Sequence, residues 1–212
     1  MKNIDKSAMA IEVFNKRANE YAEKYMDVHL YHDTLDIFCM QIEQEGASIL
    51  ELGCGPGNNT KYLLEQRPDF KILATDLAPN MMELAQSNNP SVMVKLLDSR
   101  EIATLEEAYD AIMCGFCLPY LTKEEALQLI QDAAQVLNAN GVLYLSTMEN
   151  DYEKSGFQTA STGDVSHVYY HEGSYLTEAL LAYNFELVTV KRQDFPTQDG
   201  TKVTDLIIIA RK

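Results

Sequence analysis

The sequence predicts an α/β fold, in which a helical cap precedes a doubly wound, mostly parallel sheet of seven strands. Three observations lead to this prediction. Short apolar runs take turns with helical stretches along most of the 212 residues, as in parallel sheets covered by helices on both faces. A glycine-rich turn follows the first apolar run. Two consecutive runs, 186–192 and 203–210, close the chain and are expected to pair as an antiparallel hairpin.

Two amphipathic helices are predicted before the first strand. From Ser7 to about Tyr25, apolar and aromatic residues recur at spacings of three and four, and a second such stretch runs from about Val28 to Ile42. The second stretch is expected to stop near Gly46, since glycine is common at helix ends. Residues 1–45 are therefore interpreted as an N-terminal helical cap.

The core elements follow from the same alternation. A first strand is expected from Ser48 to the glycine turn, and a helix that ends at Pro68 should follow it. The next elements are a strand 71–75 closed by Asp76, a helix begun by Pro79, a strand 92–97 closed by Asp98, a strand 109–114, a helix 123–137 with Thr122 as N-cap, a strand 142–147 and a helix 174–183. Gln198-Asp199-Gly200 is expected to be the turn of the closing hairpin.

The whole chain, 1–212, is interpreted as a single domain. Its core comprises 46–148 and 173–212. The connection 149–172 between them is long and rich in Gly, Ser, Thr and Tyr, and connections of that length within compact domains tend to be functional. We therefore interpret 149–172 as a candidate substrate lid.

Composition narrows the class of partner. The formal net charge is −15, which disfavours nucleic acid, because binding to phosphates depends on Lys and Arg. No long apolar run or signal-peptide pattern is present, so no membrane partner and a cytoplasmic location are predicted.

The stretch Glu51-Leu52-Gly53-Cys54-Gly55-Pro56-Gly57 indicates a small-molecule site. Glycines at alternate positions remove the Cβ atoms that would hold a ligand away from the backbone, and they permit turn dihedrals that other residues avoid. The helix that follows offers free backbone N–H groups at its start. This turn is the centre of the predicted site.

Two acids stand at matched places beyond the turn. Asp76 and Asp98 close the second and third predicted strands, and ligands of open parallel sheets bind at these carboxyl ends. The spacing from Gly53 to Asp76 suits a ribose diol, and NAD as well. The dinucleotide fingerprint, however, would place glycine at position 58, where Asn58 stands.

These residues together resemble the class I S-adenosylmethionine-dependent methyltransferases, in particular small-molecule members of the type 11 and type 25 kind. The family's glycine motif has the form E/D-x-G-x-G-x-G, as in 51–57 here. The resemblance runs from about residue 46 to the C-terminus and includes 109–116 in the place of the fourth motif and the closing hairpin. It implies the Rossmann-like methyltransferase fold.

The resemblance also implies a set of residues that bind S-adenosylmethionine, the cofactor of the family. The turn approaches the methionine and ribose, the next acids hold the ribose hydroxyls and adenine, and the fourth motif faces the methionine amine. Aromatic residues of the cap help to enclose the cofactor. The implied cofactor-binding residues are Tyr21, Tyr25, Glu51, Gly53, Cys54, Gly55, Gly57, Asp76, Leu77, Asp98, Ser99, Gly115 and Phe116.

The reaction that the resemblance implies is transfer of a methyl group to an oxygen, nitrogen or carbon atom of a small molecule. Members that methylate nucleic-acid amines carry Asn/Asp-Pro-Pro-aromatic in the fourth motif, whereas this chain has 115–120 as Gly-Phe-Cys-Leu-Pro-Tyr. Two alternatives stay open: a non-catalytic S-adenosylmethionine-binding module that acts with a partner, and an NAD-dependent oxidoreductase. The oligomeric state is not predicted.

Histidines stand outside the predicted core, in the two segments expected to cover the strand ends. His167 and His171 are the candidate catalytic residues, because histidine suits a general base near neutral pH. Two other interpretations remain: a metal site formed with His29 and His32, and ordinary loop residues. No metal is predicted.

Overall fold

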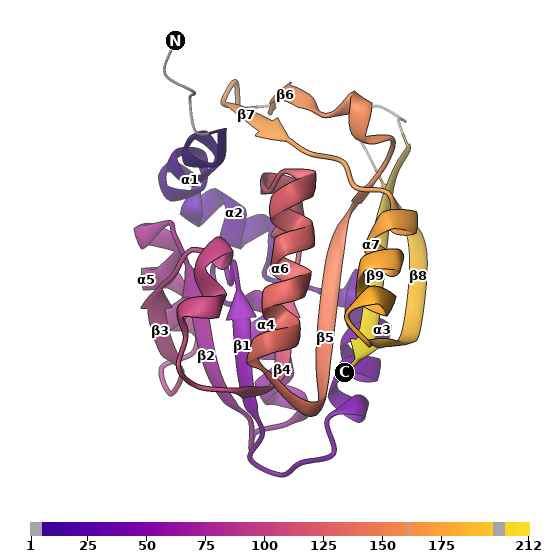
Figure 1. Ribbon diagram of the computed structural model, residues 1–212. Helices are drawn as coiled ribbons and strands as arrows, with labels where there is room; N and C mark the ends of the chain where they lie inside the picture. Colours follow the sequence, from indigo (N-terminus) through magenta and orange to yellow (C-terminus); the bar gives the residue numbers. More distant parts are fainter. Residues whose placement is uncertain (1–5, 161, 197–201) are drawn as a thin grey trace.

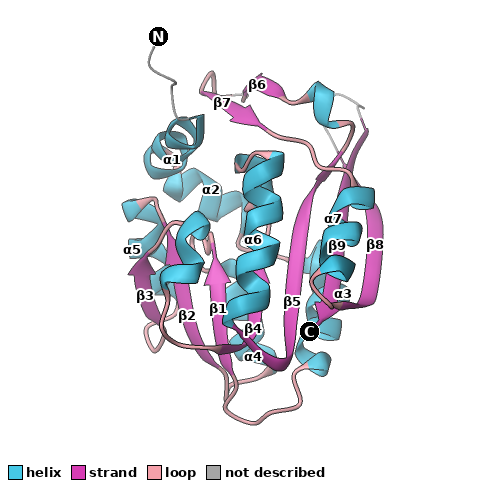
Figure 2. Cartoon of the chain, in the orientation of Figure 1, coloured by secondary structure: helices cyan, strands magenta, loops and turns pink. Residues whose placement is uncertain are grey.

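The seven-stranded sheet dominates the computed structural model, which describes residues 6–160, 162–196 and 202–212 (Figures 1 and 2). The strand order is β3-β2-β1-β4-β5-β9-β8. β1 to β5 run parallel, and β9 pairs antiparallel with both β5 and β8. The strands are β1 (Ser48–Leu52), β2 (Lys71–Asp76), β3 (Met93–Leu96), β4 (Tyr109–Cys114), β5 (Leu137–Glu149), β8 (Glu186–Pro196) and β9 (Lys202–Arg211). The predicted fold class is confirmed.

Helices cover both faces of the sheet, as Figure 1 shows. The α-helices are α1 (Lys6–Lys16), α2 (Ala18–Tyr25), α3 (His32–Gln41), α4 (Asn58–Gln66), α5 (Pro79–Asn88), α6 (Lys123–Val136) and α7 (Gly173–Ala182). Short 3-10 helices are η1 (His29–Tyr31), η2 (Ser99–Thr104), η3 (Leu118–Tyr120) and η4 (Tyr152–Lys154). α6 and α7 pack on one face and α3 and α4 on the other, so the sheet separates two apolar clusters.

The alternation of side chains along β4 shows how the two clusters form. Ile112 and Cys114 belong to the cluster under α6, whereas Ala111 and Met113 belong to the cluster under α3. Because neighbouring residues of a strand point to opposite faces, a strand buried on both sides is apolar throughout. This explains why the strands read as continuous apolar runs in the sequence.

Most core boundaries agree with the sequence predictions. Pro79 begins α5, and Thr122 caps α6 in a capping box with Glu125. The predicted turn Gln198-Asp199-Gly200 lies outside the described residues. In the part of the chain that the structure describes, no helix is both long and apolar enough to cross a bilayer.

The cap differs from its prediction at two places. The predicted helix from Ser7 to Tyr25 is two helices, because Arg17 leaves the helical region (φ −107°, ψ 21°) and its guanidinium bonds to Asp164 at 2.7 Å. The predicted helix from Val28 begins instead with η1, and its α-helical part ends at Gln41. The break at Arg17 thus coincides with a long-range ion pair that local periodicity does not reveal.

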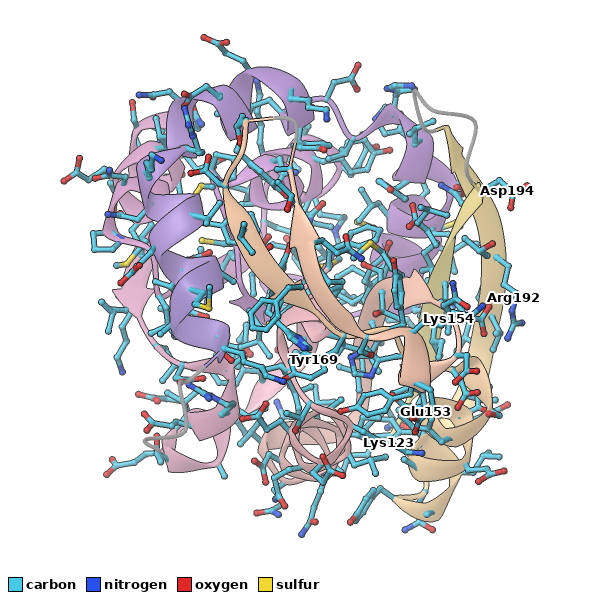
Figure 3. All side chains as sticks on the ribbon, turned by 90° about the horizontal axis from the view of Figure 1, so that it is seen from above. Lys123, Glu153, Lys154, Tyr169, Arg192 and Asp194 are labelled. Atoms are coloured by element: carbon cyan, nitrogen blue, oxygen red, sulfur yellow. The ribbon has the colours of Figure 1, made fainter. Side chains whose placement is uncertain are left out.

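The segment 149–172 is folded rather than irregular. It contains η4 and a two-stranded antiparallel hairpin of β6 (Gly156–Thr159) and β7 (Val165–Val168). Figure 1 places this hairpin beyond the carboxyl ends of the strands, next to α1. Seen from above in Figure 3, it crosses the middle of that end, while Arg192 and Asp194 mark the outer edge at β8.

Candidate functional site

A cavity of about 560 Å³ opens at the carboxyl ends of β1, β2 and β4. Its walls come from the cap, the glycine turn, the ends of β2 and β4, and the outer parts of β5 and β9. Eleven of the thirteen predicted cofactor-binding residues line it: Tyr21, Tyr25, Gly53, Cys54, Gly55, Asp76, Leu77, Asp98, Ser99, Gly115 and Phe116. The topology therefore brings the predicted residues to one place, as expected for an open parallel sheet.

The glycine turn adopts the conformation that its sequence predicts. Gly53, Gly55 and Gly57 all have left-handed dihedrals, with φ of 63°, 54° and 81°, which residues with a Cβ rarely adopt. A Cβ on Gly55 would point toward the Tyr21 ring, with Cε1 3.8 Å away. The absent side chain therefore leaves open space between the turn and the cap.

Gly57 serves packing rather than the cavity wall. A Cβ there would lie 2.4 Å from Asn89 Nδ2 and 3.1 Å from the Cα of Ala85, both at the end of α5. Asn89 also donates a hydrogen bond to the Gly57 carbonyl at 3.0 Å. The third glycine thus lets the turn approach α5 closely.

Asp76 combines a structural role with free acceptor capacity. Its Oδ2 accepts from the Gly55 N–H at 2.9 Å and its Oδ1 from the Ala78 N–H at 2.8 Å. Burial raises the pKa of the carboxyl, and these backbone bonds oppose the rise. The Leu77 backbone N–H also opposes the rise. A carboxylate has about four acceptor sites, so acceptor capacity remains for a ligand hydroxyl.

Asp98 lines the cavity but already has a cation beside it. Arg100 donates to it from the backbone N–H at 2.9 Å and from the guanidinium, with Nη2 2.6 Å from Oδ2. Burial raises the pKa of Asp98, but the bonds from Arg100 outweigh it and the pKa is lowered. The sequence prediction did not include Arg100 in the site.

Aromatic rings of the cap form the roof of the cavity. The rings of Tyr21 and Tyr25 lie 4.6 Å apart between centroids, and Phe14 meets Tyr21 edge-on at 5.5 Å. Tyr120, from η3, meets Phe14 at 5.0 Å. These aromatic residues therefore pack together and line the cavity at the same time.

Phe116 holds an uncommon backbone conformation. Its φ is 52°, and its N–H donates to Ser146 Oγ at 2.9 Å. Positive φ is costly for a bulky residue, and strain of this kind gathers at functional sites. This hydrogen bond to Ser146 on β5 helps to keep Phe116 at the cavity wall.

Glu51 is predicted to bind the cofactor, but it is not among the residues that line the cavity. The side chain is 1% exposed and accepts a hydrogen bond from the Thr60 hydroxyl. Burial raises the pKa of Glu51 to about 7, which the bond from Thr60 opposes. Its contacts tie the end of β1 to α4 beneath the turn.

The two candidate catalytic histidines, His167 and His171, also lie outside the cavity lining. Both nitrogens of His171 are engaged: Nε2 with the Leu118 carbonyl at 2.8 Å, and Nδ1 with the Tyr175 hydroxyl. Since a carbonyl only accepts, Nε2 carries the hydrogen and Nδ1 accepts. Burial lowers the pKa of His171, so the ring is a neutral link between η3 and α7.

His167 joins the hairpin to the cap. Its Nε2 lies 3.2 Å from Lys6 Nζ, and its ring packs against Tyr169 and Phe157 at centroid distances of 4.4 and 5.0 Å. Burial, followed by the charge of Lys6, lowers the pKa of His167. Tyr169, labelled in Figure 3, directly follows β7 of the hairpin.

The other histidines have separate environments. His29 is exposed beside Asp27, at 3.2 Å, and His32 stacks on Tyr62. Across the described ranges, no three or more His, Cys, Asp or Glu side chains are grouped to hold a metal ion.

Asp205 and Tyr31 are among the lining residues that were not predicted from the sequence. Asp205, on β9, is 2% exposed, and its Oδ2 accepts from the Tyr31 hydroxyl at 2.8 Å. The available signal was the acid itself, which directly precedes the apolar run 206–210. For Tyr31 no comparable signal existed.

The observed residues fit S-adenosylmethionine. Asp76 retains acceptor sites for the ribose, and the Gly55 turn leaves backbone and space that a side chain would fill. The aromatic roof and four aspartates of the lining suit a sulfonium cation. The geometry of the cavity is therefore compatible with the predicted cofactor.

The chain is similar in sequence to known methyltransferases. Residues 49–141 match a family model described as "Methyltransferase domain". A malonyl-[acyl-carrier protein] O-methyltransferase of Acetivibrio thermocellus is 31% identical over 148 residues, which cover 68% of this chain and 50% of that protein. A trans-aconitate 2-methyltransferase of Variovorax paradoxus is 32% identical over 109 residues, covering 51% and 41%. The chain thus spans about half, or less, of the length of these relatives.

Among solved structures, the magnesium protoporphyrin IX methyltransferase of Synechocystis PCC 6803, described with bound SAM, has a TM-score of 0.73 at 16% identity. The match covers 100% of this chain and 99% of that one. At this identity, the likeness concerns the fold.

Proposed function

Since the chain belongs to the class I S-adenosylmethionine-dependent methyltransferases, we propose that it binds S-adenosylmethionine in this cavity and transfers the methyl group to a small molecule. The observation that carries the proposal is the pairing of the left-handed turn with Asp76, whose carboxylate bonds to the Gly55 N–H and keeps further acceptor sites. The relatives' descriptions name methyl acceptors of small-molecule and acyl-carrier type, which supports this class of substrate.

Different residues of the chain are assigned to different parts of the cofactor. We assign the ribose hydroxyls to Asp76, the adenine side to Leu77 and Ser99, and the methionine side to the backbone of Gly53 and Gly115. These five residues, with Gly55 and the roof residue Tyr21, are called the donor half below. Backbone groups and short side chains dominate it, so the site is largely formed before the ligand arrives.

The expected contribution of the protein is mainly positional. When bound, S-adenosylmethionine supplies an electrophilic methyl group on a sulfonium. Holding an acceptor in line with that group contributes roughly 7–11 kcal/mol to a bimolecular step, whereas a general base contributes about 3–5 kcal/mol. The rings of Phe14, Tyr21 and Tyr120 pack edge-on and cover part of the cavity.

The catalytic roles predicted for His167 and His171 remain predictions. The contacts of His171 with Leu118 and Tyr175 leave neither nitrogen for proton transfer and favour a structural role. His167 contacts the cap through Lys6 and can affect turnover through the position of the hairpin.

Thermal unfolding with added ligand tests the proposal. S-adenosylhomocysteine at a hundredfold excess over its Kd should add about 2.7 kcal/mol of stability and raise the midpoint by roughly 5–10 °C. NAD serves as the competing ligand, and stabilisation by NAD alone would refute the proposal. A protein that binds S-adenosylhomocysteine but never forms it from S-adenosylmethionine would be the non-catalytic module instead.

A further inference from the structure

A buried carboxylate stands in the cavity without a full set of partners. Asp205 lines the cavity and is 2% exposed. Its Oδ2 accepts from Tyr31, but among the described residues nothing donates a hydrogen bond to Oδ1. Oδ1 is not among the fully enclosed side-chain atoms that lack a partner, so it is open to the cavity that Asp205 lines. A ligand in the cavity can therefore donate a hydrogen bond to this oxygen.

Tyr31 is held firmly toward Asp205. Its ring packs against Phe116 at a centroid distance of 5.3 Å, and its carbonyl accepts from the Thr34 hydroxyl at 2.9 Å. On the other side of η1, Gln193 of β8 donates to the Leu30 carbonyl at 3.0 Å. Burial, followed by the charge of Asp205, raises the pKa of Tyr31, so its hydroxyl stays protonated and donates.

Tyr31, Phe116, Tyr144 and Asp205 form what we call the acceptor half of the cavity. Tyr144 is linked through the Thr34 hydroxyl, at 3.1 Å, to the η1 backbone that carries Tyr31. Phe116 adjoins Gly115 of the donor half and touches Tyr31. The acceptor half therefore begins where the donor half ends.

The groups around Asp205 leave its charge uncompensated. Tyr31 of η1 and Tyr144 of β5 are the titratable groups that face it, and the register places Met148 of β5 and Gln193 of β8 beside it. Burial raises the pKa of Asp205 to about 6, although the bond from Tyr31 opposes the rise. The carboxylate is therefore ionised, and basic, near neutral pH.

Among the described residues that line the cavity, every basic side chain already contacts another group. Lys24 contacts the ring of Tyr25, His29 the carboxylate of Asp27, and Arg100 that of Asp98. An acceptor carboxylate would instead approach the charge of Asp205, and like charges repel strongly at a buried site.

We propose that Asp205 is the catalytic base of methyl transfer, and that the acceptor is a neutral or cationic molecule with an N–H or O–H nucleophile on an apolar or aromatic body. The inference rests on the proposed function. The nucleophile donates its hydrogen bond to Oδ1, and Tyr31 holds the carboxylate from the other side. Phe116 and Tyr144 contact the body of the acceptor.

The proton and electrons balance in this step. The nucleophile's lone pair forms the bond to the methyl carbon, and its proton passes to Oδ1 of Asp205. The electron pair of the broken carbon–sulfur bond stays on sulfur, which gives neutral S-adenosylhomocysteine. The aspartic acid then releases the proton to water when the product leaves.

The test uses Asp205→Asn and a matched control, Asp194→Asn. Asp194 carries the same group on β8, where it is exposed and does not line the cavity; Figure 3 shows it at the outer edge of the molecule. Calorimetry with S-adenosylhomocysteine comes first, and all three proteins should bind it equally. Failure of the wild type to bind would refute the proposed function itself, whereas binding lost in Asp205→Asn alone would assign Asp205 to the donor half and overturn this inference.

Unfolding of the free proteins separates a functional from a structural role. Asp205→Asn near neutral pH should be at least as stable as the wild type, because it removes an unpaired buried charge. Lower stability than that of Asp194→Asn would show a structural carboxylate and overturn the inference.

Turnover identifies the class of acceptor. Each protein is incubated with ¹³C-methyl S-adenosylmethionine and a panel of tyramine, catechol, trans-aconitate, benzoate and a small-metabolite extract, and NMR distinguishes N-methyl and ether products from methyl esters. We expect N-methyl or ether products, made about 100-fold or more slowly by Asp205→Asn, and normally by Asp194→Asn. Methyl esters, undiminished turnover by Asp205→Asn, or no product from a wild type that binds S-adenosylhomocysteine would each overturn the inference.

Discussion

The donor half and the acceptor half of the cavity are built in different ways. The donor half relies on backbone: Gly53 and Gly55 in left-handed conformations, and Asp76 bonded to two backbone N–H groups. The acceptor half relies on side chains from distant segments, since Tyr31 and Asp205 are 174 residues apart.

This difference matches the demands on each half. A ligand that a whole family shares can be bound by backbone groups, whose geometry few substitutions disturb. An acceptor that differs between relatives is better bound by side chains, because these can change without affecting the fold. Five predictions test or sharpen this division, beginning with the largest expected effect.

Asp76→Ala should abolish most binding of S-adenosylhomocysteine. The ribose contacts are charge-assisted hydrogen bonds of about 1.5–3 kcal/mol each, so affinity should fall about 100-fold or more. Calorimetry measures the loss, and Glu83→Ala, an exposed acid on α5, is the control. An unchanged affinity would remove Asp76 from the donor half.

Gly57→Ala and Gly55→Ala should separate packing from binding within one turn. Alanine at 57 has φ of 81° and a Cβ 2.4 Å from Asn89 Nδ2, so unfolding stability should fall by roughly 2–4 kcal/mol. Alanine at 55 meets nothing closer than 3.8 Å and should cost only about 1–2 kcal/mol while weakening ligand affinity. Equal losses of stability would contradict the division.

Asp205 should make folding stability depend on pH in the direction opposite to an ordinary aspartate. Its folded pKa of about 6 lies above the unfolded value, so the ionised form destabilises the native state. The destabilisation is absent below about pH 4 and complete above about pH 6, where it reaches an order of 2–3 kcal/mol. Denaturant unfolding of the wild type and Asp205→Asn across this window should show the stability difference between them change by that amount. A constant difference would show that Asp205 has an ordinary pKa.

His171→Ala should reduce stability rather than cofactor binding. It removes the bonds to the Leu118 carbonyl and the Tyr175 hydroxyl at a site with 0% exposure, and leaving those partners unpaired costs about 1–3 kcal/mol. Denaturant unfolding measures this loss and calorimetry checks the affinity. Turnover lost at full stability would restore the catalytic assignment.

Arg17→Ala should have the smallest effect, on the segment 149–172. Arg17 and Lys16 hold Asp164 at 2.7 and 2.6 Å and fasten the hairpin to the cap. Exposed ion pairs contribute little to global stability, but amides of β6 and β7 should exchange faster while the core does not change. Lys154→Ala, whose lysine contacts Asn150 within the same segment, is the control. Unaltered exchange in Arg17→Ala would show that the fastening lies elsewhere.

The sequence by itself determined the donor half. Alternating apolar and helical stretches predicted a parallel sheet, and the glycine turn and Asp76 were predicted at its carboxyl ends. These features depend on local physics, namely strand and helix periodicity and the dihedrals open to glycine. The resemblance to methyltransferases came from the same residues, and residues 49–141 match a methyltransferase domain.

Only the tertiary structure decided which side chains complete the cavity. Local sequence does not show that η1 lies against β9, that Arg17 breaks the first helix to meet Asp164, or that Arg100 binds Asp98. The sequence also predicted that Glu51, Gly57 and the two histidines act directly at the ligand. All four lie outside the cavity lining. The physical reason is that burial and pairing of polar groups depend on contacts between distant segments, which no local pattern records.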